Sequence, residues 1–109
     1  MTGTDDQEFE SLRAQARWQI QENKHLIASL KELRRKSNIS QEELAFRMGI
    51  TQPAVSAIEK GNADSSLGTI RRYANALGYV ISYEIHPASS IDTLSEKQQP
   101  GPKKLTNAL

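Results

Sequence analysis

The chain has 109 residues, of which 37% are hydrophobic and 25% charged, with a formal net charge of +1 and no cysteine. This length suits one small domain with tails, and the lack of cysteine excludes disulfides, thiol chemistry and the commonest structural zinc ligands. No apolar run approaches the roughly 20 residues that span a bilayer, and the acidic start differs from a secretory signal. We therefore expect a soluble, cytoplasmic protein that does not contact a membrane.

The basic residues are concentrated in the middle of the chain. Between residues 24 and 83 there are nine Lys or Arg and five Asp or Glu, whereas the first ten residues contain four acidic residues and no basic one. A moderate positive excess suits a protein that reads a DNA sequence better than a nonspecific coat, whose affinity depends almost wholly on neutralising phosphates.

The first two predicted elements are amphipathic helical segments. In the first, from about Asp5 to Glu22, apolar residues recur at three- and four-residue steps; they are Phe9, Leu12, Ala16 and Ile20. The second ends in three basic residues near Lys36, which favour a helix C-terminus; its apolar residues are Leu26, Ile27, Leu30 and Leu33. No Gly or Pro separates the segments, so they form either one long helix or two that break near Asn23.

Residues 39–61 are predicted to form two short helices joined by a tight turn. Ser40 and Glu43 have the spacing of a capping box, so we expect the first of these helices to start at residue 41 and to end near residue 48. Gly49 supplies the positive φ that commonly ends a helix.

The start of the next helix, expected at about 52–60, has two interpretations because of Pro53. If Thr51 is the cap, its hydroxyl bonds the N–H of Ala54 and Pro53 is the second helical residue; if Gln52 is the cap, Pro53 takes the favoured first position. Hydrophobic residues before and after Thr51 have the spacing of a staple, which favours Thr51.

A further helix is expected from about Ser66 until Gly78, and a strand after it. The helix buries an apolar stripe: Leu67, Ile70, Ala74 and Leu77. Beyond Gly78 the apolar period changes to two, the pattern of a half-buried strand. The strand residues are Val80, Ile81, Ser82, Tyr83, Glu84 and Ile85. Because a lone strand leaves its backbone groups unpaired, we expect it to pair with its own copy across a two-fold axis and to form a dimer contact.

Several phrases resemble the Cro/C1-type (Xre) helix-turn-helix family, from about residue 26 to residue 77. They are Ser40-Gln-Glu-Glu-Leu-Ala, Gly49-Ile-Thr and Ile58-Glu-Lys-Gly. The resemblance implies a mainly α-helical, five-helix, lambda-repressor-like domain at residues 24–78. The other predicted parts are an N-terminal helical extension (1–23), a C-terminal dimerisation strand (79–86) and a disordered tail (87–109), the last because of its Ser, Pro, Gln and Lys content.

In this family the third helix enters the major groove of DNA, and the resemblance implies base contacts from its exposed side. The candidates are Gln52, Pro53, Ser56 and Ala57. Gln52 is the strongest of them, because its amide can bond N6 and N7 of one adenine together. Pro53 and Ala57 stand where family members often carry polar side chains, and they can contact only thymine methyl groups.

The resemblance also implies contacts outside the bases. Phosphate contacts are expected from Gln41, Thr51 and Lys60, the first because it opens a helix whose N–H groups face a phosphate. A solvated helix end is the other interpretation of Lys60. Arg47 and Glu59 have the family's spacing for a salt bridge between the second and third helices, and a contact of Arg47 with DNA is the alternative.

The order of amphipathic helix, helix-turn-helix and strand is similar to antitoxins of the HigA kind, whose partners are small RelE-like ribonucleases. The resemblance implies a homodimeric repressor that binds a palindromic operator in double-stranded DNA at the nucleoid and neutralises a small basic toxin. The alternatives are a stand-alone phage-type or controller regulator without a toxin, and a protein-interaction adaptor that has lost DNA binding. His25 and His86 are isolated and no catalytic motif is found, so we expect no enzyme activity, cofactor, metal ion or small-molecule ligand.

Overall fold

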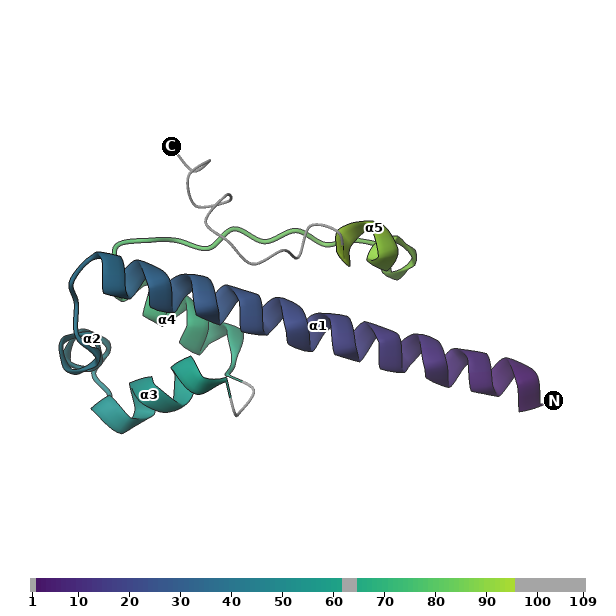
Figure 1. The fold of residues 1–109 in the computed structure, drawn as a ribbon, viewed down its shortest axis with the longest axis horizontal. Helices are drawn as coiled ribbons and strands as arrows, with labels where there is room; N and C mark the ends of the chain where they lie inside the picture. Colours follow the sequence, from purple (N-terminus) through teal and green to yellow (C-terminus); the bar gives the residue numbers. More distant parts are fainter. Residues whose placement is uncertain (1, 62–64, 96–109) are drawn as a thin grey trace. The chain divides into compact units, whose positions relative to one another are not determined.

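The structure, a computed structural model, describes residues 2–61 and 65–95. These residues form five α-helices and one 3-10 turn, and no β-strand occurs among them (Figure 1). The chain divides into two units. Residues Leu26–Tyr83 form what we call the central unit, and Met1–His25 with Glu84–Leu109 form the terminal unit. Within the described ranges, no helix combines the length and the apolarity that crossing a membrane requires.

The first helix, α1, runs without a break from Thr2 to Lys36. This result decides between the two interpretations of the N-terminal segments, because no helix start occurs near Asn23. Three basic residues occupy the last turn of α1, as its predicted C-terminus requires. Asn38 follows with a φ of 59°, a left-handed conformation that Asn tolerates better than most residues, and it turns the chain toward the next helix.

The second and third helices, α2 (Gln41–Met48) and α3 (Gln52–Lys60), begin at the predicted caps. The Ser40 hydroxyl oxygen accepts a hydrogen bond from the backbone N–H of Glu43 at 3.0 Å. The Thr51 hydroxyl oxygen accepts from the N–H of Ala54 at 3.3 Å, which confirms Thr51 as the cap. Between the helices Gly49 has a φ of 72°, so the turn takes a conformation that a residue with a Cβ rarely adopts.

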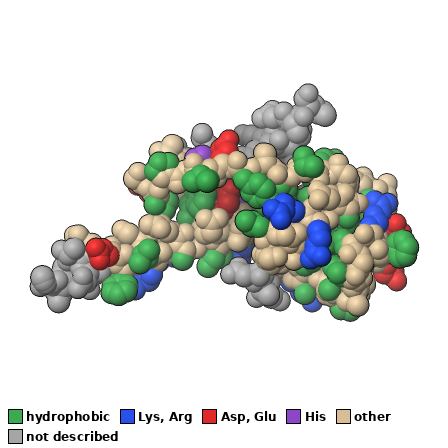
Figure 2. Space-filling model, turned by 180° about the vertical axis from the view of Figure 1, so that it is seen from behind, with side chains coloured by type: hydrophobic (Ala, Val, Ile, Leu, Met, Phe, Trp, Pro, Cys, Tyr) green, Lys and Arg blue, Asp and Glu red, His purple; other side chains and the backbone are tan. Residues whose placement is uncertain are grey.

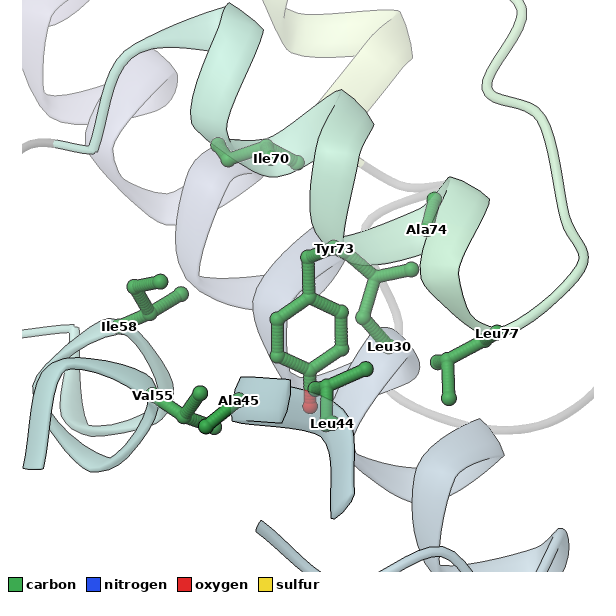
Figure 3. Packing of buried hydrophobic residues seen from close by; sticks show 9 residues of the cluster. All are labelled: Leu30, Leu44, Ala45, Val55, Ile58, Ile70, Tyr73, Ala74 and Leu77. Carbon is green, nitrogen blue, oxygen red and sulfur yellow. The ribbon is translucent and has the colours of Figure 1, made fainter. Parts of the chain in front are cut away.

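The fourth helix, α4 (Leu67–Ala76), closes the core of the central unit. Ser66 caps it by accepting from the N–H of Thr69 at 3.1 Å. The core brings together one face of each helix of the unit (Figure 3). Its buried residues are Leu30, Leu44, Ala45, Val55, Ile58, Ile70, Tyr73, Ala74 and Leu77. Because these side chains come from four helical segments, their burial fixes α3 against α2 and α4.

The predicted C-terminal strand is wrong for the described chain, since residues 79–87 have no regular secondary structure. A half-buried strand would turn Ile81, Tyr83 and Ile85 to the same side; Ile81 packs against the core, but Tyr83 is 49% exposed and Ile85 99% exposed. An alternating pattern cannot itself provide the second backbone segment that a strand pairs with, and residues 2–61 and 65–95 contain no strand that could serve as one.

Two short elements lie in the segment that was predicted to be disordered. A 3-10 turn, η1 (Ala88–Ser90), follows Pro87 and leads directly into α5 (Ile91–Ser95). The rest of the predicted tail, residues 96–109, lies outside the described residues. The described residues therefore contain five α-helices. The central unit includes the end of α1 together with α2, α3 and α4, whereas α5 belongs to the terminal unit.

Candidate nucleic-acid interface

Helix α3 has a buried side and an exposed side. Val55 is 0% and Ile58 9% exposed, so both belong to the core. The residues predicted to contact bases lie elsewhere on the helix: Gln52, Pro53 and Ala57 are exposed and Ser56 is half-buried. Their contacts with DNA remain predictions.

The first residues of α2 and α3 are hydrogen-bonded to each other. The Gln52 side-chain nitrogen Nε2 donates to Oε1 of Gln41 over 2.6 Å. Both residues stand at helix N-termini, where free backbone N–H groups and the helix dipole favour an anion such as a phosphate. The amide pair thus places the predicted phosphate contact and the predicted base contact side by side.

Gln41 is held in turn by Glu59, whose side chain is 2% exposed. Nε2 of Gln41 donates to Oε1 of Glu59 at 2.9 Å. Arg34 donates from Nε to Oε2 at 2.7 Å and from Nη2 to Oε1 at 3.1 Å. Tyr73 donates from its hydroxyl to Oε2 at 2.5 Å. Each carboxylate oxygen accepts two hydrogen bonds, so all four acceptor positions of Glu59 are occupied.

These contacts decide the charge of Glu59. Burial by itself would raise the pKa of Glu59, but the hydrogen bonds from Arg34, Tyr73 and Gln41 outweigh it and hold the pKa below its ordinary value. The hydrogen bond to Glu59 raises the pKa of Arg34. Burial, together with the same carboxylate, raises the pKa of Tyr73. At neutral pH Glu59 is therefore a carboxylate, and its neighbours are donors.

The predicted salt bridge between Arg47 and Glu59 is wrong. Nε of Arg47 instead lies 3.0 Å from Oε2 of Glu43, one helical turn earlier on α2, and Nη1 donates to the backbone oxygen of Ala76 at 3.1 Å. Arg47 is exposed, whereas Glu59 turns its carboxylate inward, where Arg34 reaches it from α1. The ion pair that anchors α3 therefore joins it to α1.

Arg34 and Tyr73 are the members of this network that the sequence interpretation missed. The sequence predicts Arg34 only as one of three basic residues at the C-terminus of a helix, and it predicts no polar contact for Tyr73. A signal for Arg34 existed, because it follows the buried Leu30 by four residues and so lies on the same face of α1. A buried Arg requires a carboxylate, and Glu59 is the one acidic residue of α3.

Lys60 and Thr51, the two other predicted phosphate contacts, are both exposed at the ends of α3. The Thr51 hydroxyl already accepts the capping hydrogen bond, and its own hydrogen is left to donate. On the face that Figure 2 shows, Lys and Arg side chains stand in small separate groups, one of which lies beside Asp or Glu side chains. This distribution agrees with the modest positive excess of the sequence.

Comparison with known proteins identifies the scaffold. The helix-turn-helix family HTH_3 matches residues 30–83. An uncharacterized HTH-type transcriptional regulator of Methanothermobacter thermautotrophicus is 43% identical over 49 residues, which are 45% of this chain and 71% of that protein. The chain therefore belongs to the helix-turn-helix family.

A second set of relatives carries a more specific name. Antitoxin HigA1 of Mycobacterium tuberculosis, in two strains, is 46% identical over 57 residues, which are 52% of this chain. The match spans only 38% of the length of these curated relatives. No solved structure matches the chain significantly.

Proposed function

We propose that this chain is a sequence-specific, double-stranded-DNA-binding transcriptional repressor with no catalytic activity of its own. The observation that carries the proposal is the pair of amides at the starts of α2 and α3, joined over 2.6 Å and anchored on the buried Glu59. A helix-turn-helix protein reads bases from the start of its second helix, and a side chain that is already positioned there loses less conformational freedom on binding.

In this proposal α3 lies in the major groove and its exposed residues meet base edges. Gln52 bonds an adenine, because the amide matches the donor and acceptor at N6 and N7. Pro53 and Ala57 contact thymine methyl groups, and Ser56 adds a polar contact at the groove wall. Gln41, Thr51 and Lys60 contact the phosphate backbone of the DNA. One side-chain N–H of Gln41 is bonded to Glu59, and the second is left to donate to a phosphate. Thr51 and Lys60 stand at the two ends of α3.

The test of DNA binding is selection of duplexes from a random pool by the purified chain, followed by footprinting on the DNA upstream of its own gene. We expect one enriched palindromic sequence and protection of the same sequence at that promoter. Recovery of duplexes without a common sequence would contradict a sequence-specific repressor.

A palindromic operator requires two copies of the chain, with their recognition helices about 34 Å apart. We propose that residues 80–85 form the self-association surface, because this segment exposes large apolar side chains. Val80 is 88% exposed and Ile85 99% exposed. Changing both to Lys should shift the chain toward the monomer in sedimentation at micromolar concentration and weaken operator binding. A Val80→Lys, Ile85→Lys variant that remains dimeric would place the contact elsewhere.

We further propose that the repressor is an antitoxin that neutralises a small basic RelE-like toxin, which the likeness to HigA1 supports. A candidate contact is the exposed stripe of α1, where Phe9 and Leu12 are both 59% exposed and Ile20 is 48% exposed. Glu8 and Glu10 are exposed on the same stretch and suit a basic partner.

Purification from the native host tests the antitoxin proposal. A small basic protein should co-elute in fixed stoichiometry and should be lost from a Phe9→Asp, Leu12→Asp variant that still binds the operator. If no such partner co-elutes, the alternative is a stand-alone regulator, in line with the Methanothermobacter relative, which is named for transcription regulation alone.

A further inference from the structure

The hydrogen bonds between Glu59, Gln41 and Gln52 run in one direction. An ionised carboxylate has no hydrogen to give, so Gln41 must turn its NH₂ group toward Glu59, as the 2.9 Å bond from Nε2 to Oε1 shows. The carbonyl oxygen of Gln41 then faces Gln52, which has to donate in return, and its Nε2 lies 2.6 Å away. The charge on Glu59 therefore determines the orientation of both amides.

This orientation limits what Gln52 can offer to DNA. A glutamine amide has two N–H donors and one carbonyl acceptor, and one donor is committed to Gln41. The groups left are one N–H and the carbonyl oxygen. Adenine presents an acceptor at N7 and a donor at N6 in the major groove, which this pair matches; guanine presents two acceptors, N7 and O6. At guanine the carbonyl oxygen would face a second acceptor.

If both amides were turned the other way, the groups that Gln52 offers to the base would match guanine. If Gln41 offered a hydrogen to Gln52, the Gln52 carbonyl would accept it and both N–H groups would remain, which is the pattern that guanine binds. We infer that Glu59 is a positioning residue for base selection, which makes this chain select adenine over guanine at the base that Gln52 reads. The inference rests on the proposed function, since it concerns the same helix and the same DNA.

The network lets this inference be tested without removing Glu59. Three of the four hydrogen bonds to the carboxylate come from Arg34 and Tyr73, so Glu59 stays in place when Gln41 is changed. All of these residues lie within the central unit. Gln41 is also only half-buried at the first position of α2, where a substitution disturbs little packing.

Two variants change the orientation in different ways. In Gln41→Lys the ammonium group can only donate, so it bonds Glu59 and the carbonyl oxygen of Gln52 and leaves two N–H groups for the base. In Gln41→Met the side chain has a similar length but no donor, and Gln52 can turn freely. Binding is measured by fluorescence anisotropy on two duplexes that differ only by adenine or guanine at the base pair where Gln52→Ala loses discrimination.

The readout is the ratio of the two dissociation constants, because a change in phosphate contact affects both duplexes and cancels. The unmodified chain should favour adenine by roughly tenfold. Gln41→Met should lower the ratio, because Gln52 can then also turn both N–H groups toward guanine, and Gln41→Lys should bring the ratio to one or reverse it. Thermal unfolding of each variant checks that the fold is retained.

Three results would overturn the inference. If both variants keep the original ratio, or if the unmodified chain favours guanine, Glu59 does not set the selection, while sequence-specific binding still stands. If the unmodified chain binds all duplexes alike, the proposed function fails together with the inference. The comparison of the unmodified chain with its variants therefore separates the two failures.

Discussion

Tyr73 donates its phenolic hydrogen to Oε2 of Glu59 over 2.5 Å, although its ring is 1% exposed and lies in the middle of the hydrophobic core. One residue thus belongs both to the core and to the polar network. From Glu59 the network continues through Gln41 to Gln52 on the exposed side of the protein. The amide that we propose to read a base is therefore connected to the core by consecutive hydrogen bonds.

The first prediction concerns the Tyr73 hydroxyl. Tyr73→Phe keeps the ring and removes one hydrogen bond to a charged acceptor, so it should lower the free energy of unfolding by about 1.5 to 3 kcal/mol. Tyr79→Phe is the matched control, because Tyr79 is 44% exposed. Urea unfolding measures both, and equal effects of the two substitutions would contradict a structural role for the Tyr73 hydroxyl.

The second prediction separates the two arginines that could pair with Glu59. Arg34→Met leaves the Glu59 carboxylate buried without its cation and should cost about 3 to 5 kcal/mol of unfolding free energy. Arg47→Met removes an exposed pair with Glu43, and its cost should stay below about 1 kcal/mol. If the Arg47 substitution proves the more costly of the two, the ion pair that anchors α3 has been assigned to the wrong helix.

The third prediction concerns the dependence of stability on pH. Because the pKa of Glu59 is lower in the folded protein than its ordinary value of 4.5, the unfolded chain takes up the proton first as the pH falls. The stabilisation from Glu59 is present above pH 4.5 and is lost as the pH falls through the lower folded value. Glu59→Gln lacks this contribution, so the difference in unfolding free energy between the two proteins should narrow in acid.

Urea unfolding of both proteins at several pH values between neutrality and pH 3 measures this difference. The other carboxyl groups are common to both chains and serve as the internal control. A difference that stays constant over the range would show that the Glu59 carboxyl group does not have a lowered pKa in the folded state.

Local signals in the sequence predicted the caps of the helix-turn-helix correctly. Ser40 and Thr51 act through residues three positions away, so the spacing alone contains the information. The burial of Val55 and Ile58 on one side of α3 likewise agrees with helical periodicity. These features depend on contacts within one or two turns of a helix.

The errors concern contacts between distant segments. Arg34 and Glu59 are 25 residues apart, and choosing between Arg34 and Arg47 as the partner requires knowing which side of α3 faces α1. The predicted strand is wrong for a related reason. The alternation of apolar and polar residues around Ile81 reflects the contact of Ile81 with the core, but it does not indicate a second backbone segment with which a strand could pair. The direction of the Gln41 and Gln52 amides likewise depends on Glu59, which no local pattern connects to them.

The fourth prediction tests the proposed phosphate contact of Lys60. Lys60→Ala should weaken binding to all duplexes alike and should reduce the slope of log affinity against log salt by about one unit, since one fewer counterion is released. Lys24→Ala is the control, because Lys24 is exposed but lies before the residues that match the helix-turn-helix family. An unchanged salt dependence in Lys60→Ala would remove Lys60 from the interface.

The most direct test of the account is the affinity of Gln52→Ala for the selected operator and for a shuffled duplex of the same composition. If Gln52 reads a base from the start of α3, the substitution should cost about 1 to 3 kcal/mol on the operator, almost nothing on the shuffled duplex, and relax the preference at one base pair of each half-site. Equal losses on the two duplexes would show that Gln52 contacts only the DNA backbone and would contradict the assignment of α3 as the sequence-reading helix.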